Sequence, residues 1–393
     1  MKAAPAPVNP LACARCGRHV IGMTGKSKRP NREERLAAAL RENLHRRKEQ
    51  ARASEAAHRR VAASDFQALE RLASRGDAEA KLALGIALLG HARSAEALER
   101  AVELIETASA AGHPRASEQC ALLECVGIGR PVDWTKALDR LQQAAEQGSP
   151  GAARQLAIFA DPDGKTAPPD SPLPHSYGTL RRSIDERSML AAREGQTVTA
   201  RPFISVRQKF AGAAECRWLI DTAGENLGPS TVFDYSTGAL QSDPRRTSRA
   251  AMFTFDRIDL VVEMIRARIA ASLALPLPHF EVSQVLHYAP GQEFKPHHDY
   301  FDPAAEGFHQ EISTRGQRVA TFLIYLNGEF TGGETQFPSL GFRYRGQTGD
   351  AITFMSVDPD GQPNPLTLHS GLAPASGEKW IFSQWVRDRR SEA

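Results

Sequence analysis

Small residues recur at a fixed spacing in the first half of the chain, within a helical pattern of apolar positions. Glycine and, four residues later, alanine repeat every 36 residues, at Gly76 and Ala80, Gly112 and Ala116, and Gly148 and Ala152. Glycine ends a helix at low cost, and small alanine side chains let neighbouring helices approach closely. Equal periods in this range are typical of stacked helix pairs. The pattern predicts an α-solenoid over residues 63–160.

The pattern changes from helical to alternating in the second half of the chain. Short apolar runs separated by Gly and Pro lie at 281–289, 319–327, 333–339, 342–347, 351–357, 366–371 and 379–387. Many short strands with such turns predict a double-stranded β-helix, or jelly roll. Two supporting helices are expected before it, one opening near Ala213 and one from Asp256 to Ala274. The predicted class is therefore multidomain, with an α-solenoid followed by an α+β jelly roll.

Two stretches lack both patterns and complete the domain organisation. Residues 1–31 are rich in Pro, Gly and Lys and are predicted to be unstructured. Residues 31–60 are a helix candidate whose surface is mostly basic. Residues 161–200 open with clustered Pro and Gly, which predicts a linker, with a short helix expected at 183–194. The predicted divisions are a tail and basic helix (1–62), helical repeats (63–160), a linker (161–200) and a catalytic domain (201–393).

Charge is spread unevenly along the chain. The formal net charge is only +3, which gives no general case for nucleic acid as a partner. Residues 1–60 nevertheless hold fifteen Lys/Arg against five Asp/Glu. This basic arm is either a solvated helix or a segment that docks on an acidic partner, nucleic acid or membrane surface. No apolar run is long enough for a membrane span, so a cytoplasmic location is expected.

The cysteines do not form a framework of the secreted kind, because their number, five, is odd. Cys13 and Cys16 form a C-x-x-C near His19, but a zinc site needs about four ligands. They are interpreted as tail cysteines, with a metal site as the alternative, and a start at Met23 would remove them. The others are interpreted as buried thiols of a reduced compartment: Cys120, Cys125 and Cys216.

The stretch QVLHYAPGQEFKPHHD, residues 284–299, contains two candidate metal ligands. In a strand, residues i and i+2 point to the same face, so His297 and Asp299 project together while His298 points away. With the distant His369 they would complete a two-histidine-one-carboxylate triad, which leaves positions open for substrate and oxygen on a non-haem iron. A bare H-x-D triplet also arises by chance, so its context has to support the assignment.

A lysine ten residues after the distant histidine supplies that context. Lys379, in HSGLAPASGEKWIFSQWVRDR, can pair with the far carboxylate of a dicarboxylic co-substrate. Alternation places Ile381, Ser383 and Trp385 on the same strand face as Lys379, and this face is expected to look into the metal cavity. Nearby polar residues off that face are interpreted as solvent or loop residues: His287, Asp302 and His309.

Residues 201–390 resemble the catalytic domain of the prolyl 4-hydroxylases, in the iron- and 2-oxoglutarate-dependent oxygenase superfamily. The matching blocks are RRTSRAAMF (245–253), QVLHYAPGQEFKPHHDYF (284–301), GQRVATFLIYLNGEFTGGETQFP (316–338), TGDAITF (348–354) and LHSGLAPASGEKWIFSQWVRD (368–388). The resemblance implies a jelly-roll fold, Fe(II), 2-oxoglutarate and a procollagen-proline 4-dioxygenase-like activity on a peptidyl proline. It also implies ascorbate as a reductant for the iron.

The resemblance further implies roles for single residues. The iron ligands and the lysine that pairs with 2-oxoglutarate carry over to His297, Asp299, His369 and Lys379. Tyr288 and Thr335 match positions that line the co-substrate pocket, where a hydroxyl can bond a carboxylate. Arg318 and Trp385 match positions near the substrate peptide, and a flat indole is suited to packing a pyrrolidine ring.

Two residues near the expected metal site depart from the family pattern. Phe294 stands where a tyrosine is common, and His298 stands where an aromatic residue is frequent. These departures leave the metal ligands intact and bear on substrate identity. Trp380 falls on the opposite strand face from Lys379 and is expected in the core.

The helical segment resembles a second family, the Sel-one-like repeats, which are relatives of the tetratricopeptide repeats. The stretch GIGRPVDWTKALDRLQQAAEQGSPGA, residues 127–152, carries the G-x-G, KA, AA and G-x-x-x-A elements of that pattern. This resemblance implies a protein-binding scaffold and no chemistry of its own.

Three functional interpretations follow from these features. The leading one is a dioxygenase that hydroxylates a prolyl residue in a peptide or protein, releases succinate and CO2, and uses its repeats to recruit a protein partner. A second keeps the chemistry but takes free proline or another small molecule. A third is an adaptor whose oxygenase domain is inactive, although the presence of all three ligands and the lysine argues against it.

Overall fold

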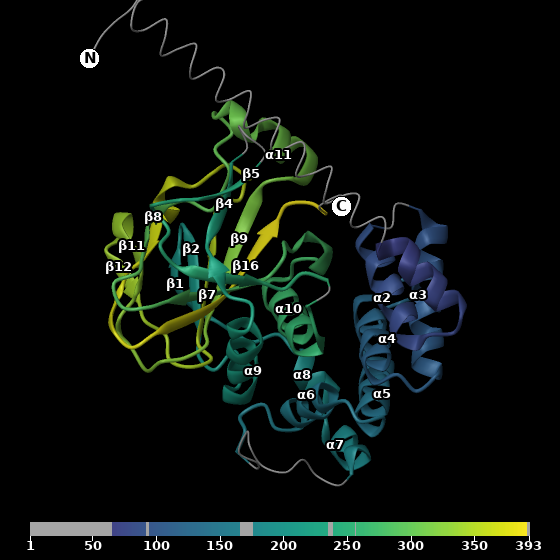
Figure 1. Ribbon diagram of the computed structural model, residues 1–393. Coiled ribbons are helices and arrows are strands. Elements are labelled where there is room, and N and C mark those ends of the chain that lie inside the picture. Colours follow the sequence, from purple (N-terminus) through teal and green to yellow (C-terminus); the bar gives the residue numbers. More distant parts are fainter. Residues whose placement is uncertain (1–64, 92–93, 166–175, 235–238, 256, 391–393) are drawn as a thin grey trace, which may run out of the picture. The chain divides into compact units, whose positions relative to one another are not determined.

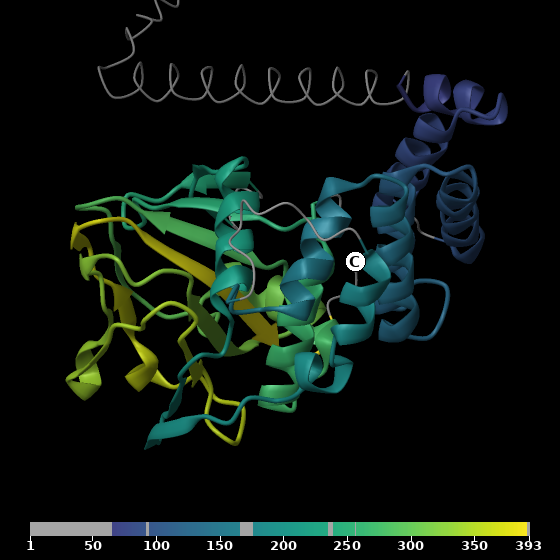
Figure 2. The ribbon, with the colours of Figure 1, turned by 90° about the horizontal axis from the view of Figure 1, so that it is seen from below.

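The repeating helical pattern of the first half folds into helices that pack in succession. The computed structural model describes residues 65–91, 94–165, 176–234, 239–255 and 257–390. Within the repeat region α2 packs on α3, α3 on α4, α4 on α5 and α5 on α6 (Figure 1, Figure 2). Their bounds are Ala78–His91 for α2, Ala95–Ala110 for α3, Pro114–Val126 for α4, Trp134–Glu146 for α5 and Pro150–Ala160 for α6. The predicted α-solenoid is confirmed.

The 36-residue spacing has a direct structural cause. Gly76, Gly112 and Gly148 all take positive φ angles, of 97°, 85° and 96°, in the turns that precede α2, α4 and α6. A residue with a side chain rarely adopts this conformation, so glycine recurs. The alanine that follows each of them is buried between helices. The basic arm, its predicted helix and the C-x-x-C pair lie outside the described residues.

The second half forms two facing β-sheets. Within the described residues the larger sheet has the strand order β1-β2-β13-β9-β16-β7-β6-β3, with antiparallel neighbours. Its strands are β1 (Gln196–Ala200), β2 (Phe203–Arg207), β13 (Ala351–Met355), β9 (Arg318–Tyr325), β16 (Lys379–Arg387), β7 (Gln284–Tyr288), β6 (Arg249–Met252) and β3 (Gly228–Pro229).

A smaller sheet faces it, with the order β12-β11-β14-β8. Its strands are β12 (Phe342–Tyr344), β11 (Thr335–Phe337), β14 (His369–Gly371) and β8 (Phe294–His297). Two short antiparallel pairs complete the described strands: β4 (Thr231–Asp234) with β5 (Ala239–Ser242), and β10 (Thr331–Gly332) with β15 (Pro374–Ser376). Apolar side chains of both sheets meet in a core between them, which includes Ile204, Tyr325, Phe337 and Ile381. The predicted jelly roll is confirmed.

Two helices lie against the outer face of the larger sheet. The helix α9 spans Ala213–Gly224, as predicted from the sequence. The helix α10 spans Leu260–Leu273, and the Asp259 side chain caps it by accepting a hydrogen bond from the Val262 amide. The predicted start at Asp256 was therefore too early, because the capping carboxylate comes three residues later. A short helix, α11, spans His309–Arg315.

The stretch between the repeats and the jelly roll contains regular structure. Its helices are α7 (Tyr177–Ser183) and α8 (Glu186–Leu190), and α8 falls inside the short helix predicted at 183–194. The strand β1 pairs with β2, so the larger sheet begins shortly before residue 201. Among the described residues no helix is both long and apolar enough to cross a bilayer.

One hydrophobic core joins the repeat helices to the jelly roll. The same cluster of buried side chains includes Leu138 and Leu156 of the repeats, Ile265 of α10, and Phe382 of the larger sheet. The buried Gln155 side chain of α6 also accepts a hydrogen bond from the Leu260 amide at the start of α10. These elements therefore pack as one unit, in agreement with the continuous contacts from Phe66 onward.

Candidate metal and co-substrate site

Two of the predicted metal ligands lie side by side on neighbouring strands of the smaller sheet. His297 ends β8 and His369 begins β14, and the antiparallel register pairs them directly. Asp299 lies two residues beyond His297, in a bend just past the end of β8. The alternation that places residues i and i+2 on one face thus extends one step past the strand. The structure brings all three residues together, as the sequence predicted.

The three side chains are spaced to share one metal ion. The Nε2 atoms of His297 and His369 each lie 3.6 Å from a carboxylate oxygen of Asp299. The two imidazole centroids are 4.3 Å apart, and the ligand atoms all lie within 4.8 Å of one another. Two imidazoles and one carboxylate at this spacing are the donor set of the facial triad of non-haem Fe(II) oxygenases. The residues present therefore fit such a metal.

Backbone carbonyls orient both imidazoles. Nδ1 of His297 lies 2.8 Å from the Lys295 carbonyl oxygen, and Nδ1 of His369 lies 3.0 Å from that of Thr367. A carbonyl oxygen only accepts, so each Nδ1 donates, and each Nε2 of a neutral ring keeps a lone pair for a metal. Burial, followed by the neighbouring His369, lowers the pKa of His297 to about 3, which keeps this ring neutral.

The third ligand is held in its ionised form. Burial alone would raise the pKa of Asp299, but the two histidines and a hydrogen bond from Thr321 outweigh it and lower the pKa to about 2. The Thr321 hydroxyl donates to Oδ2 of Asp299 at 2.6 Å. A carboxylate that stays negative when buried is suited to bind a divalent cation.

The three ligands open into a pocket between the two sheets. The pocket is lined by Arg246, Leu286, Tyr288, Phe294, His297, Asp299, Leu323, Thr335, His369, Ser370, Gly371, Lys379, Ile381, Ser383 and Trp385. The predicted strand face of Lys379, Ile381, Ser383 and Trp385 therefore looks into the metal pocket, as expected from alternation.

Lys379 is a buried cation in this pocket. Its side chain is 2% exposed, and Nζ lies 5.0 Å from the ring centre of Tyr288 and 5.6 Å from that of Tyr325. Burial lowers the pKa of this amine to about 7, and the charge of Glu334 offsets only part of that effect. Such a buried amine fits the carboxylate of a small dianion such as 2-oxoglutarate, because pairing would restore its charge.

The two predicted hydroxyl residues line the same pocket. Tyr288 pairs with Lys379 in the register of β7 and β16, so the phenol lies beside the amine. The Thr335 hydroxyl lies 2.8 Å from that of Tyr325, which in turn donates to the Tyr344 carbonyl oxygen. Both predicted positions are therefore near Lys379, and Tyr325 is an additional hydroxyl that the sequence did not single out.

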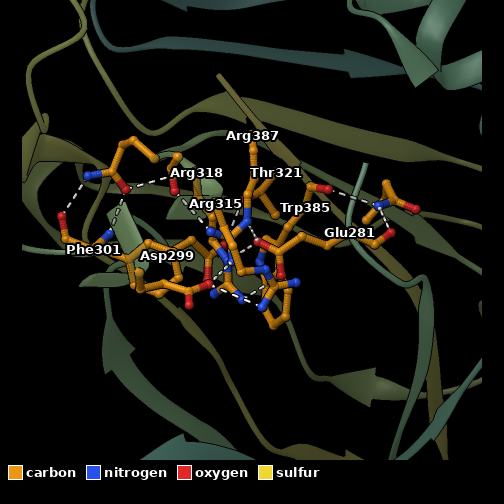
Figure 3. A network of polar contacts seen from close by, with 12 residues as sticks. Glu281, Asp299, Phe301, Arg315, Arg318, Thr321, Trp385 and Arg387 are labelled. Carbon is orange, nitrogen blue, oxygen red and sulfur yellow. Dashed lines mark hydrogen bonds and ion pairs between the residues drawn. The ribbon is translucent and has the colours of Figure 1, made fainter. Parts of the chain in front are cut away.

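The predicted substrate residues form a stacked pair at the metal end of the pocket. The guanidinium of Arg318 lies over the Trp385 ring, 3.7 Å from its centre. Its Nε and Nη2 donate to the two oxygens of Glu281, at 2.7 and 2.8 Å, and Arg387 donates to the same carboxylate at 2.7 Å (Figure 3). Trp385 lines the pocket, whereas Arg318 packs on the indole and is not among the lining residues.

The register of β16 with its two neighbours shows that Lys379 and Trp385 lie at opposite ends of the pocket. On β16, Lys379 pairs with Tyr288, whereas Trp385 pairs with Thr321 of β9, the residue that bonds Asp299. Six residues of strand separate Lys379 from Trp385, or roughly 20 Å at ~3.3 Å per residue. The amine and the indole therefore lie at opposite ends of one face, with the indole at the level of the metal ligands.

Sequence reasoning missed a second cation in the pocket. Arg246 is buried, and its Nη2 donates to the Gln284 side chain at 3.2 Å, while Nε has no acceptor among the described residues. Its guanidinium lies over the ring of Phe294, which stacks on the His297 imidazole with centroids 3.5 Å apart. The only signal in the sequence was its place in the block RRTSRAAMF.

Three further side chains, those of His287, Trp380 and His298, point away from the metal ligands. His287 was expected at the surface or in a loop, and this was wrong: it is a buried residue of β7, and its ring lies 4.4 Å from that of Trp380 on the outer face of the sheet. Trp380 packs against the main core, as predicted. His298 points away from the metal ligands, with Nε2 3.1 Å from the Pro365 carbonyl oxygen.

Known proteins match both halves of the chain. The profile of the 2OG-Fe(II) oxygenase superfamily matches residues 283–387. Prolyl 4-hydroxylase 1 of Arabidopsis thaliana is 36% identical over 208 residues, which cover 49% of this chain and 72% of the plant protein. The solved viral collagen prolyl hydroxylase of Paramecium Bursaria Chlorella virus-1, in its 2OG complex, is 30% identical, with 47% of this chain and 95% of that chain covered and a TM-score of 0.37.

A further match lies in the helical half. A Sel1 repeat protein from Oxalobacter formigenes is 24% identical, with 24% of this chain and 72% of that chain covered and a TM-score of 0.22. The identity to the plant enzyme and the share of it that is covered, together with the three ligands and the lysine in one pocket, establish the family. The chain belongs to the prolyl 4-hydroxylases of the 2OG-Fe(II) oxygenase superfamily.

Proposed function

We propose that this protein hydroxylates a prolyl residue in a peptide or protein, with 2-oxoglutarate and O2 as co-substrates and succinate and CO2 as co-products. The observation that carries this proposal is the single pocket that joins the metal-binding triad, the buried amine of Lys379 and the indole of Trp385. One oxygen atom of O2 enters the substrate C–H bond and the other enters succinate, so atoms and electrons balance.

His297, Asp299 and His369 would hold Fe(II), and the bound metal and 2-oxoglutarate would together supply the oxidising chemistry. The protein's own part is to bind and orient. The two histidines present Nε2, because their Nδ1 atoms are engaged by carbonyl oxygens. Asp299 stays ionised and partly offsets the metal charge.

Lys379 would bind the far carboxylate of 2-oxoglutarate. The pocket holds an amine whose charge is disfavoured by burial, and an incoming carboxylate would reverse that effect. Tyr288 borders the amine and can bond the same carboxylate through its hydroxyl group; Thr335 lines the same pocket and could do so by turning its hydroxyl away from Tyr325. With its far carboxylate at Lys379, the co-substrate would reach the metal with its 2-oxo acid end, and the side of the pocket at Trp385 would remain for the substrate.

Trp385 and Arg318 would receive the substrate. The indole is a flat apolar surface at the level of the metal ligands, suited to a pyrrolidine ring. Its Nε1–H is buried and has no acceptor among the described residues, so a peptide carbonyl could take this hydrogen bond. An indole N–H in a buried setting usually has such a partner.

A second enzymatic candidate is the same reaction on free proline. The helical repeats favour the peptide or protein over it, because stacked helix pairs commonly present binding surfaces for other proteins. We also propose that ascorbate keeps the iron reduced. The free thiols of Cys120, Cys125 and Cys216 are buried, which favours a reducing compartment such as the cytoplasm as the place where the protein acts.

Activity assays with defined substrates test the proposal. Purified protein would be incubated with Fe(II), 2-oxoglutarate, ascorbate and proline-containing peptides, with free proline as a parallel sample. We expect succinate release coupled to the mass increase of one oxygen atom on a prolyl residue. Hydroxylation of free proline alone, or an absence of succinate with every substrate, would contradict it. A comparison of modified proteins in cells with and without the gene would then identify the physiological target.

A further inference from the structure

Each of the three metal-binding side chains is oriented by one hydrogen bond, but the sources of these bonds differ. Both histidines bond carbonyl oxygens two residues earlier in their own segments. Both also belong to paired strands, so the sheet already fixes their backbone. Asp299 lies past the end of β8, where no ladder bond orients it. Its hydrogen bond comes instead from a side chain of the opposite sheet, Thr321.

Thr321 is well placed to fix a carboxylate. It lies in β9, which is flanked by β13 and β16 in the middle of the larger sheet, and it is 1% exposed. Its hydroxyl donates to Oδ2 of Asp299 at 2.6 Å, a distance typical of a charge-assisted O–H···O⁻ bond. Figure 3 shows Thr321 directed at Asp299 within the network around Trp385.

A side chain that directly precedes the same strand secures the backbone that follows Asp299. The Gln317 amide accepts from the Phe301 N–H at 2.7 Å and donates to the Phe301 carbonyl at 2.6 Å. The segment after the ligand is thus clamped to the start of β9, and Thr321, four residues further on, acts on the carboxylate itself. The two contacts join the metal-bearing bend to the larger sheet.

We propose that Thr321 is a positioning residue for the metal: its bond to Oδ2 fixes the rotation of the Asp299 carboxylate, so that the two carboxylate oxygens stay directed at Nε2 of His297 and of His369. The proposal rests on the proposed function, because it assumes that these residues hold a metal. A hydrogen bond to one oxygen restricts rotation of the carboxylate and so pre-arranges it for the ion. Groups that bond to metal ligands in this way commonly alter metal affinity by ~10- to 100-fold.

The chain offers a matched control for a purely structural hydroxyl. Thr353 lies on β13, beside β9, and is also completely buried. Its hydroxyl donates to the backbone carbonyl of Thr321 at 2.9 Å and touches no metal ligand. A buried threonine in this sheet can therefore satisfy its hydroxyl with a carbonyl, whereas that of Thr321 bonds the carboxylate.

The experiment measures Co(II) binding to full-length Thr321→Val, Thr321→Ser and Thr353→Val proteins. Titration gives the dissociation constant, and the visible absorption of the bound Co(II) reports its coordination. We expect Thr321→Val, which keeps shape and loses the donor, to weaken binding by about 10- to 100-fold and to change the absorption. Thr321→Ser should keep the wild-type constant within about threefold. Thr353→Val should lower the thermal midpoint and leave the constant unchanged.

The outcomes separate this inference from the proposed function. If Thr321→Val binds Co(II) with the wild-type constant and spectrum, or if Thr353→Val weakens binding as much, the positioning role is refuted while the enzyme assignment stands. If the wild-type protein binds Co(II) but modifies no prolyl peptide, the proposed substrate fails and the role of Thr321 stands. If the wild-type protein binds no metal, both are refuted.

Discussion

The repeat helices and the metal pocket are assembled in opposite ways. In the repeats, each helix packs on the next in sequence, and the turn glycines return every 36 residues. In the pocket, His297 meets His369 across 72 residues of chain, and Lys379 pairs with Tyr288 across 91. The repeats therefore depend on contacts between neighbours, whereas the pocket exists only after the two sheets have closed. Changes to the first region should act on stability, and changes to the second on binding and turnover.

The comparison has a limit, because both regions share one hydrophobic core. Leu156 of α6 belongs to the same cluster as Ile265 of α10 and Phe382 of β16. The capping region of α10 adds polar contacts, since Asp259 accepts from the Trp218 indole at 2.7 Å and the Leu260 amide donates to Gln155. Repeat residues in this core should therefore influence the jelly roll, and repeat residues outside it should not.

The largest expected effect is the loss of a metal ligand. Asp299→Ala should abolish succinate release, because the remaining two imidazoles cannot complete the triad. The metal-free protein should still fold, because the change removes one side-chain hydrogen bond, that from Thr321, and leaves the strand ladders and the Gln317 contacts intact. Coupled 2-oxoglutarate turnover and a thermal melt are the measurements. Residual turnover at the wild-type rate would exclude Asp299 as a ligand.

A change in the shared core should come next in size. Leu156→Ala creates a cavity among buried residues and should cost about 2–5 kcal/mol of unfolding free energy. Because Leu156 packs in the core that reaches β16, hydrogen exchange should accelerate in β9 and β16 as well as in the repeats.

The matched control for this change is Leu84→Ala. Leu84 of α2 is equally buried but belongs to a small separate cluster with Ala73 and Ala80. Its replacement should accelerate exchange in the first repeat helices and leave β9 and β16 as in the wild type. Exchange in the sheet that is equal for both variants would show that the shared core does not couple the two regions.

Loss of the buried amine of Lys379 should weaken the binding of 2-oxoglutarate, a smaller effect than the two above. A hydrogen bond to a charged group is worth ~1.5–3 kcal/mol, so Lys379→Ala should raise the 2-oxoglutarate concentration needed for half-maximal turnover by about 10- to 100-fold. Lys379→Arg keeps the charge and should lose less. An unchanged 2-oxoglutarate requirement in Lys379→Ala would place the far carboxylate elsewhere.

The smallest effect is a pH dependence of co-substrate binding. Burial lowers the pKa of Lys379 to about 7, so the amine is charged below that pH and increasingly neutral above it. The carboxylates of 2-oxoglutarate stay ionised throughout this range. Pairing above pH 7 requires uptake of a proton, so affinity should fall by up to about tenfold per pH unit.

The arginine variant checks the origin of this pH dependence. An arginine remains charged over the whole range, so Lys379→Arg should bind 2-oxoglutarate with little change between pH 7 and 9. Direct titration of 2-oxoglutarate with the Co(II)-loaded protein is the measurement. The same pH slope in the wild-type and Lys379→Arg proteins would assign the dependence to another group.

Sequence reasoning reached much of the site because its strongest signals are local. Alternation along 379–387 was enough to predict that Lys379, Ile381, Ser383 and Trp385 share a face, and all four line the pocket. Alternation along β9 likewise places Thr321 on the face of Leu323, but the sequence did not connect that threonine with Asp299. Arg246 was missed for the same reason, since its neighbours in the pocket lie far away along the chain.

Periods and motifs, which arise from helix and strand geometry, were sufficient for the repeat turns, the strand faces and the choice of His297, Asp299 and His369 as a group. The burial of Lys379, the hydrogen bond from Thr321 to Asp299 and the core shared by α6 and β16 were decided only when distant segments packed together. All three features depend on the exclusion of water when segments that are distant in sequence pack together. Only the complete fold excludes water in this way, so no single stretch of chain predicts them.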